Sequence, residues 1–202
     1  KDFELDLLEA EKLLSKKPKI FAFTHVSNAL GVITPAKKLC EIARRNNVLT
    51  LVDASQSVPH FKVDVKSLDC DFLVFSGHKM LGPMGIGVLY GKHEILEKMP
   101  PFLGGGDMVR EVSFEKTTFA DSPQKFEAGT PNVEGAVGLH AAIDYLQEIG
   151  MDEVESHDKQ ILSYALSELS KLKFVKIYGT KDLAKKCAAI SFNVGDIHAH
   201  DI

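Results

Sequence analysis

Residues 71–91 read DFLVFSGHKMLGPMGIGVLYG, and this stretch decides the fold. Its first part, Phe72 to Phe75, is a continuous apolar run of the kind found in strands that are buried on both faces of a parallel sheet. A Ser76-Gly77-His78 turn follows, then Lys79 and a glycine-rich segment, and Gly85 to Tyr90 form a second apolar run. We therefore predict two strands, with Lys79 in the turn between them.

Upstream of this stretch, apolar runs alternate with helical patterns. Leucines at helical spacing predict a helix over residues 5–14, and Lys19 to His25 and Val48 to Val52 are expected to be buried strands. Between those strands, Thr34-Pro35 predicts a helix start, with the threonine as N-cap, and the helix continues to the polar stop at Arg44 to Asn47. This order predicts an α/β fold with a mainly parallel central sheet.

Downstream, Pro100 to Pro131 is rich in glycine, charge and proline and has little periodicity, which is typical of a functional or disordered loop. Helices are expected at Val133 to Ile149 and Glu153 to Leu172, and short strands at Phe174 to Tyr178 and Ala188 to Val194. The apolar positions expected to face inward on the two helices are Val133, Ala136, Val137, Ile143, Leu146, Val154, Ile161, Leu162, Ala165 and Leu169.

Polar residues end or follow three of the predicted strands. Asn28, Asp53 and Ser76 are expected at the carboxyl ends of neighbouring strands. Open α/β sheets bind ligands in the crevice outside these ends. The sequence therefore predicts a ligand site at this edge of the sheet.

The residue types at this edge suit a carbonyl-bearing, phosphorylated ligand, although each has a simpler explanation. A desolvated Lys79 amine could form a Schiff base, or the lysine could extend from a surface loop. Ser76 and His78 could bind an anion, or could simply belong to the turn. Asp53 could pair with a pyridinium nitrogen, or could cap a short helix, and Gln56 could reach the same ligand.

Composition excludes several classes of protein. The chain has 202 residues and a net charge of -4, so we expect no nucleic-acid binding. No apolar run approaches the roughly 20 residues that span a bilayer, and the acidic first residues do not resemble a signal peptide, so we expect no membrane partner and a cytoplasmic location. Cys40, Cys70 and Cys187 are interpreted as structural, and the His198-x-His200 pair as incidental, so no metal site is predicted.

Five motifs together resemble one protein family. They are THVSNALG at 24–31, DASQSVPH at 53–60, the stretch 71–91, GGGDMV at 104–109 and FEAGTPN at 126–132. Their order and spacing are similar to the class V aminotransferase family of fold-type I pyridoxal-phosphate (PLP) enzymes. Within that family the resemblance is to SufS-type, group II cysteine desulfurases, and it covers essentially the whole chain.

The resemblance implies a fold and a set of cofactor ligands. It implies a three-layer PLP-transferase large domain over residues 1–150 and the truncated start of an α+β C-terminal domain over residues 151–202. The implied cofactor is pyridoxal 5'-phosphate, with Lys79 as Schiff-base lysine and proton shuttle, Asp53 on the pyridine nitrogen and Gln56 on the phenolic oxygen. The remaining implied cofactor-binding residues are Asn28, Ser76, His78 and, reaching the phosphate of the partner subunit in a homodimer, Thr130.

The resemblance also implies a reaction. An enzyme cysteine takes sulfur from L-cysteine, which leaves L-alanine and a persulfide that supplies an acceptor protein of iron–sulfur cluster assembly. The chain is expected to be a fragment, with the nucleophilic cysteine and the substrate-binding arginines downstream of Ile202 and two further cofactor residues upstream. Selenocysteine lyase, aminotransferase and kynureninase activities use the same cofactor residues and stay open, as does a scaffold that never binds the cofactor.

Overall fold

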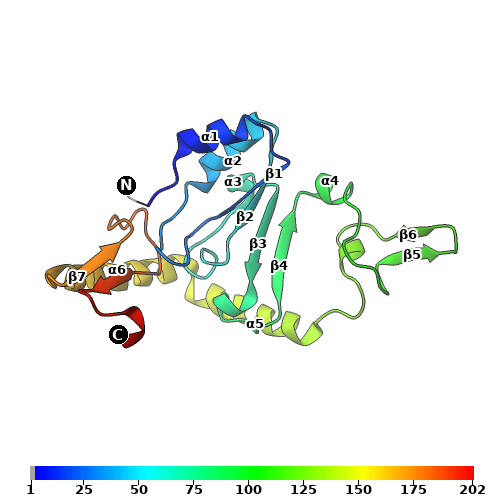
Figure 1. The fold of residues 1–202 in the computed structure, drawn as a ribbon. Coiled ribbons are helices and arrows are strands. Elements are labelled where there is room, and N and C mark those ends of the chain that lie inside the picture. Colours follow the sequence, from blue (N-terminus) through cyan, green and yellow to red (C-terminus); the bar gives the residue numbers. More distant parts are fainter. Residues whose placement is uncertain (1–2) are drawn as a thin grey trace.

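The computed structural model describes residues 3–202 and has a four-stranded sheet at its centre (Figure 1). Strands β1 (Ile20–Thr24), β2 (Leu49–Asp53) and β3 (Phe72–Ser76) are parallel neighbours, and β4 (Gly87–Gly91) joins β3 as an antiparallel edge. The mixed α/β architecture with a mainly parallel sheet, predicted from sequence, is therefore confirmed.

The helices before β2 follow the predicted order. Helix α1 (Leu7–Leu14) begins after Asp6, whose carboxylate accepts the main-chain N–H groups of Leu8 and Glu9. Helix α2 (Ala36–Arg45) begins one residue later than predicted, with Pro35 rather than Thr34 as N-cap. The main-chain N–H of Thr34 donates to the His25 carbonyl at 2.8 Å, which keeps Thr34 in the segment that follows β1.

Buried apolar side chains join the helices to the sheet. One cluster contains Cys40 from α2, Val52 and Ala54 at the end of β2, Cys70 before β3 and Leu73 within it. Short helix α3 (Val65–Leu68) packs against this cluster. Figure 1 shows α1 and α2 together on one side of the sheet and α5 on the other. All three cysteines are buried free thiols, in agreement with a structural role.

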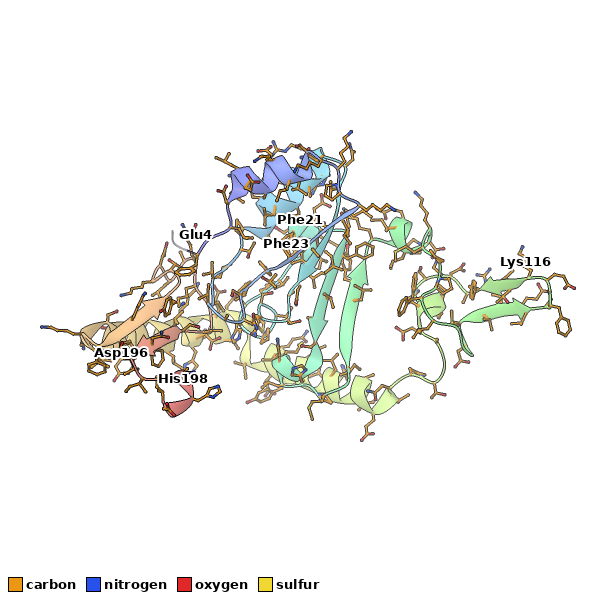
Figure 2. The ribbon with its side chains drawn as sticks, viewed as in Figure 1. Glu4, Phe21, Phe23, Lys116, Asp196 and His198 are labelled. Atoms are coloured by element: carbon orange, nitrogen blue, oxygen red, sulfur yellow. The ribbon has the colours of Figure 1, made fainter. Side chains whose placement is uncertain are left out.

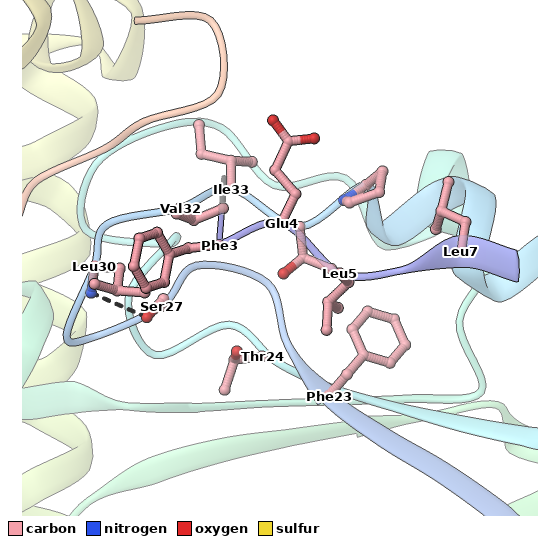
Figure 3. A pocket seen from close by; sticks show the side chains of 12 residues that line it. Phe3, Glu4, Leu5, Leu7, Phe23, Thr24, Ser27, Leu30, Val32 and Ile33 are labelled. Carbon is pink, nitrogen blue, oxygen red and sulfur yellow. Dashed lines mark hydrogen bonds between the residues drawn. The ribbon is translucent and has the colours of Figure 1, made fainter. Parts of the chain in front are cut away.

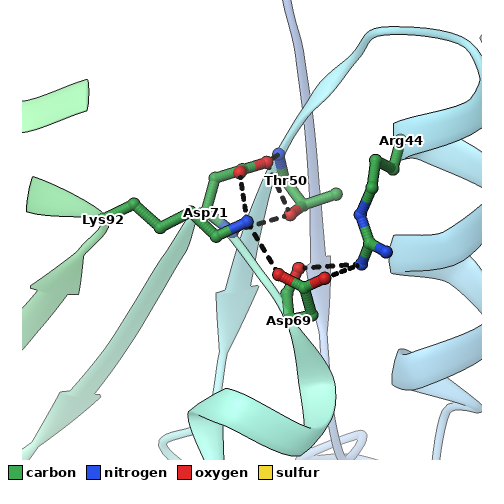
Figure 4. Close-up of polar contacts among 5 residues, drawn as sticks. All are labelled: Arg44, Thr50, Asp69, Asp71 and Lys92. Atoms are coloured by element: carbon green, nitrogen blue, oxygen red, sulfur yellow. Dashed lines mark hydrogen bonds and ion pairs between the residues drawn. The ribbon is translucent and has the colours of Figure 1, made fainter. Parts of the chain in front are cut away.

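The amino ends of β2 and β3 are joined by a polar network (Figure 4). The carboxylate of Asp71 accepts the main-chain N–H of Thr50 at 2.8 Å and its hydroxyl at 3.1 Å. The ammonium of Lys92 lies 3.1 Å from Asp71 and 2.8 Å from Asp69, which also pairs with Arg44 at the end of α2. The network thereby ties α2, β2, β3 and the end of β4 together.

The long segment predicted to lack regular structure contains a β-hairpin. After α4 (His93–Leu96), β5 (Val109–Val112) pairs antiparallel with β6 (Thr117–Phe119), and η2 (Gln124–Phe126) follows. The hairpin projects from the body, with Lys116 near its tip (Figure 2). Sequence periodicity missed these strands because four and three residues are too few to display alternation.

Helices α5 (Val133–Ile149) and α6 (Met151–Lys171) match the predicted segments, but parts of their predicted inner faces are wrong. Val133, Ala136 and Val137 are exposed, as is Ile161 on α6. Contact with the turn after β3 selects a different stripe on α5, because Leu139 and Leu146 pack against Met80. The buried residues of the two helices are Gly135, Leu139, Ala142, Leu146, Leu162 and Leu166.

The last part of the described chain is a second antiparallel pair, β7 (Val175–Tyr178) with β8 (Ser191–Val194), followed by η3 (Ala199–Asp201). Figure 2 shows Asp196 and His198 here, at the opposite end of the molecule from Lys116. The division at residue 150 stays a prediction. Among residues 3–202, no helix combines the length and apolar character that crossing a bilayer requires.

Candidate active site

Two candidate residues lie at the carboxyl ends of adjacent parallel strands. Asp53 ends β2 and Ser76 ends β3, and the register pairs Asp53 with Val74 on one side and with Thr24 on the other. Asn28 is displaced from this row, in an exposed turn four residues beyond the end of β1. The predicted convergence at one sheet edge is thus direct for Asp53 and Ser76, whereas Asn28 depends on the loop that carries it.

Ser76 carries an unsatisfied hydroxyl. Its Oγ is buried and makes no hydrogen bond with the described residues. Buried polar atoms without partners are rare in folded proteins and often mark a site for a ligand or water. The position of this hydroxyl, at the end of β3, suits it to donate to an anion bound at the sheet edge.

Lys79 and His78 lie in η1 (Gly77–Met80), directly after β3. Gly77 and Met80 are buried while His78 and Lys79 are exposed. A 3₁₀ turn repeats every three residues, so the two ends of this turn face the core and the two residues between them face outward. Of the two alternatives considered for Lys79, the described chain agrees with the exposed lysine of a surface turn.

The Asp53 carboxylate is partly used by local structure. One oxygen accepts the main-chain N–H of Ser55 at 2.9 Å, as in the capping alternative considered from sequence. A run of turns rather than a helix follows, and Gln56 lies half-buried in it. The turn therefore places Gln56 close to Asp53, near the end of β2.

His25 is a neighbour of this site that the sequence analysis assigned no partner. It follows β1, and its main-chain N–H donates to the carbonyl of Asp53 at 2.8 Å. Its Nδ1 lies 3.1 Å from the hydroxyl of Ser57, and its ring packs edge-on against Phe61. Burial lowers the pKa of His25, so the neutral ring is favoured.

His60, which lies away from this edge of the sheet, also has a partner that is distant in sequence. His60 lies 2.7 Å from Asp158 on α6, 98 residues further along the chain. The pair ties the turn after β2 to α6.

Thr130 lies exposed in the loop that leads into α5. Two residues later, Asn132 caps α5 by accepting the N–H of Gly135 at 2.9 Å, and its Nδ2 donates to the carbonyl of Gly85 at 3.2 Å. Gly85 belongs to the loop between η1 and β4. The Thr130 loop is therefore anchored beside the segment that follows Lys79.

A cavity near the end of β1 is separate from these residues (Figure 3). Its volume is about 400 Å³, and none of the candidate cofactor residues is part of its lining. Within it, the hydroxyl of Ser27 accepts the main-chain N–H of Leu30 at 3.1 Å. The lining residues are Phe3, Glu4, Leu5, Leu7, Phe23, Thr24, Ser27, Leu30, Val32, Ile33, Thr34 and Pro35.

The chain is similar to known proteins along its whole length. The model of the family described as aminotransferase class-V matches residues 1–202. A probable cysteine desulfurase of Halalkalibacterium halodurans is 49% identical over 202 residues, which are 100% of this chain and 49% of that protein. The chain thus spans about half the length of this curated relative.

Solved structures agree in fold. The apo structure of a cysteine desulfurase from Thermococcus onnurineus NA1 has a TM-score of 0.94 and 42% identity, covering 99% of this chain and 50% of that one. A structure described as a C-DES mutant with glycine covalently linked to the PLP cofactor has a TM-score of 0.80 and 25% identity, covering 92% of this chain and 50% of that one.

Proposed function

Because this chain belongs to the aminotransferase class-V family, whose members are PLP enzymes, we propose that it supplies the cofactor-holding residues of a cysteine desulfurase. We place the protein in the SufS type, acting in the cytoplasm as a homodimer that delivers sulfur to iron–sulfur cluster assembly. The family membership and the desulfurase relatives support the class of reaction. The five motifs support the SufS type.

The observation that carries the proposal is the buried, unpartnered hydroxyl of Ser76. A phosphate group at the carboxyl end of β3 would accept its hydrogen bond, and the exposed imidazole of His78 is free to turn toward the same anion. Lys79 follows at once in the chain, so its amine is within reach of the same ligand. The residues present therefore fit a phosphorylated cofactor that carries an aldehyde.

The other candidate residues fit the remaining parts of such a ligand. A carboxylate at the end of a neighbouring strand, Asp53, would pair with the pyridine nitrogen, and Gln56 would donate to the phenolic oxygen. Asn28 would belong to the same pocket. Thr130 would reach the phosphate held by the partner subunit, so that each site is completed by the dimer.

When bound, pyridoxal phosphate supplies an electron sink that stabilises negative charge on the substrate carbon next to the amine. Lys79 would hold the cofactor through its Nζ, and the same amine would move a proton at that carbon. Asp53 would keep the pyridine nitrogen protonated. Ser76 and His78 would fix the phosphate and thereby the distance between Lys79 and the reacting atoms.

The sulfur from L-cysteine has to be accepted by a thiolate. Burial raises the pKa of Cys40, and it raises the pKa of Cys70 to about 11 and that of Cys187 to about 12. Buried thiols with raised pKa values are poor nucleophiles at neutral pH. We therefore infer that the thiol that becomes the persulfide is none of these three.

Exposed apolar side chains support the homodimer. Leu81 and Met84 follow η1 and are 64% and 84% exposed, and Val133 and Val137 on α5 are 59% and 64% exposed. Pro83 lies against Gly138 of α5, so these elements are neighbours. Large exposed apolar surface beside a site is typical of a protein–protein interface.

Covalent labelling tests the proposal. PLP is added to the purified protein, the absorbance is recorded, and borohydride reduction followed by peptide mapping locates any pyridoxyl group. We expect the label on Lys79, with L-alanine formed from L-cysteine by the full-length protein. Labelling at another lysine would overturn the site, whereas labelling at Lys79 with no L-alanine would identify a different class V reaction, such as selenocysteine cleavage or transamination.

A further inference from the structure

The largest fully buried side chain in the described part of the protein belongs to a lysine. Lys186 is 1% exposed, and its Nζ donates to the carbonyl of Leu30 at 2.6 Å. Burial lowers its pKa. Removing an ammonium group from water is costly, so a lysine kept in the interior points to a role that a surface lysine could not fill.

Lys186 belongs to a segment that lies against the loop carrying Asn28. We name residues 185–191 the clamp and residues 27–33 the Asn28 loop. An isolated β-bridge joins Val32 to Lys186, the N–H of Ile33 donates to the carbonyl of Lys185 at 2.9 Å, and the N–H of Cys187 donates to the carbonyl of Gly31 at 2.7 Å. Two segments that are about 150 positions apart in sequence are therefore held together by main-chain hydrogen bonds.

The fit between clamp and loop is close. Gly31 has a φ of +65°, and a Cβ atom there would lie 2.3 Å from the carbonyl oxygen of Cys187 and 2.6 Å from that of Ala189. Both oxygens are main chain, so a larger residue could not be accommodated by a side-chain rotation. The hydroxyl of Ser191 also donates to the carbonyl of Ala29, next to Asn28.

Two main-chain hydrogen bonds also hold the loop within itself. The N–H of Ser27 donates to the carbonyl of Val32 at 3.0 Å, and the N–H of Gly31 donates to the carbonyl of Ser27 at 2.9 Å. Asn28 itself is exposed in the turn. Its direction is therefore set by the main chain of the loop, which the clamp touches at Ala29, Leu30 and Gly31.

From this geometry we propose that Lys186 is a positioning residue for the cofactor site, because its buried amine holds the Asn28 loop in the conformation that presents Asn28 to the sheet edge. The inference rests on the proposed function, because that function makes Asn28 a residue of the cofactor pocket. It adds a residue from the last fifth of the chain to a site whose other proposed residues lie between Asn28 and Thr130.

Lys186→Met tests the proposal, because methionine keeps most of the length and apolar volume and removes the donor. Lys185→Met is the matched control, since it removes an ammonium one residue away that pairs with Glu4 instead of Leu30. Two quantities are measured in the protein that carries this sequence. They are amide hydrogen exchange in residues 27–33, relative to the β5–β6 hairpin, and the Kd for PLP from its visible absorbance.

We expect Lys186→Met to speed exchange in the Asn28 loop on the order of tenfold and to raise the Kd for PLP by a similar factor. In an Asn28→Ala background the same change should raise the Kd by less than about twofold, because the loop then has nothing to position. Ser191→Ala removes only the contact to Ala29 and should give the same pattern more weakly. It serves as the test if Lys186→Met does not fold.

Lower thermal stability with unchanged loop exchange and unchanged Kd would overturn the proposal and leave Lys186 with a purely structural role. Equal effects of Lys186→Met with and without Asn28 would also overturn it. If the unmutated protein binds no PLP, the proposed function fails. The exchange measurement still decides the clamp, because an unchanged rate in residues 27–33 contradicts it.

Discussion

The two ends of the four-stranded sheet differ in how completely their polar groups are satisfied within the chain. At the amino end, Asp71 accepts two hydrogen bonds from Thr50 and pairs with Lys92. At the carboxyl end, the buried hydroxyl of Ser76 has no partner among the described residues, and Lys79 is exposed. The same sheet therefore has one end whose charged and polar groups are paired within the chain and one end where a buried hydroxyl is left unpaired among the described residues.

The pKa shifts of the titratable groups also differ between the two ends of the sheet. The hydrogen bond from Lys92 lowers the pKa of Asp69. Burial of Lys92 lowers its own pKa, but the hydrogen bonds to Asp69 and Asp71 outweigh burial, so the pKa of Lys92 is raised. Both charged forms are thus favoured at the amino end. At the carboxyl end, burial lowers the pKa of His25 and favours its neutral form. The comparison predicts that the two ends respond differently to the same substitution.

The largest expected difference concerns the two lysines. Lys79→Ala should abolish borohydride-stable PLP labelling and change the free energy of unfolding by less than about 0.5 kcal/mol, because the exposed side chain contributes chemistry rather than packing. Lys92→Ala should keep the label and lose about 1 kcal/mol of stability with its hydrogen bonds. Peptide mapping and urea denaturation measure the two quantities, and a stable label in Lys79→Ala would refute the site.

The two aspartates give the next largest contrast. Asp71→Ala leaves the N–H of Thr50 without its acceptor and removes one of the two carboxylates that pair with Lys92. It should cost about 2–3 kcal/mol, with PLP affinity unchanged. Asp53→Ala removes a single local hydrogen bond and should cost about 1 kcal/mol or less, while PLP affinity falls. Urea titration and absorbance titration of both variants test the contrast, which equal stability losses would contradict.

Ser76→Ala removes a single hydroxyl and should weaken PLP binding without lowering stability. Because the hydroxyl has no partner among the described residues, its removal should leave the free energy of unfolding without PLP unchanged or slightly higher. The Kd for PLP should rise about tenfold, as expected for one lost hydrogen bond to a charged group. A loss of more than about 1 kcal/mol in the cofactor-free protein would mean that the hydroxyl serves the fold.

The smallest expected effect is a difference in pH dependence between the ends. The folded-state pKa of His25 lies below its ordinary value of 6.5, so the unfolded chain binds a proton first and stability falls as the pH drops below about 6.5. The folded-state pKa of Asp69 lies below 3.8, so its contribution is present above that pH and is lost only below it.

His25→Gln should therefore flatten the stability profile below about pH 6.5. His157→Gln, which changes an exposed histidine of α6, is the control variant. Urea denaturation at each pH measures the profile. A decline of the same size in His25→Gln would assign the pH dependence to other groups.

The four central strands could be predicted from sequence to within about two residues. Phe72 to Phe75 was expected and Phe72–Ser76 is observed, because a buried strand is an uninterrupted local apolar run. The hairpin at 109–119 could not be predicted, since its strands are short and mostly exposed. The inner face of α5 was misjudged at Val133 and Val137, because apolar residues occur on both sides of that helix.

For the candidate site, sequence predicted which residues end strands but not their surroundings. Asp53 and Ser76 end neighbouring strands as expected. The exposure of Lys79 depends on the 3₁₀ turn, and that turn is held by packing of Met80 against Leu139 on α5, 59 residues away. The roles of these candidate residues as cofactor ligands stay predictions. They are Asn28, Asp53, Gln56, Ser76, His78, Lys79 and Thr130.

The sequence by itself determined the order of strands and helices, the residue types at the strand ends and the family, because each of these depends on residues close together in the chain. Only the tertiary structure decided that Ser76 lacks a partner, that His60 meets Asp158, and that Lys186 is buried against Leu30. The reason is physical: burial and hydrogen bonding depend on which distant segments meet, and no local pattern encodes that meeting.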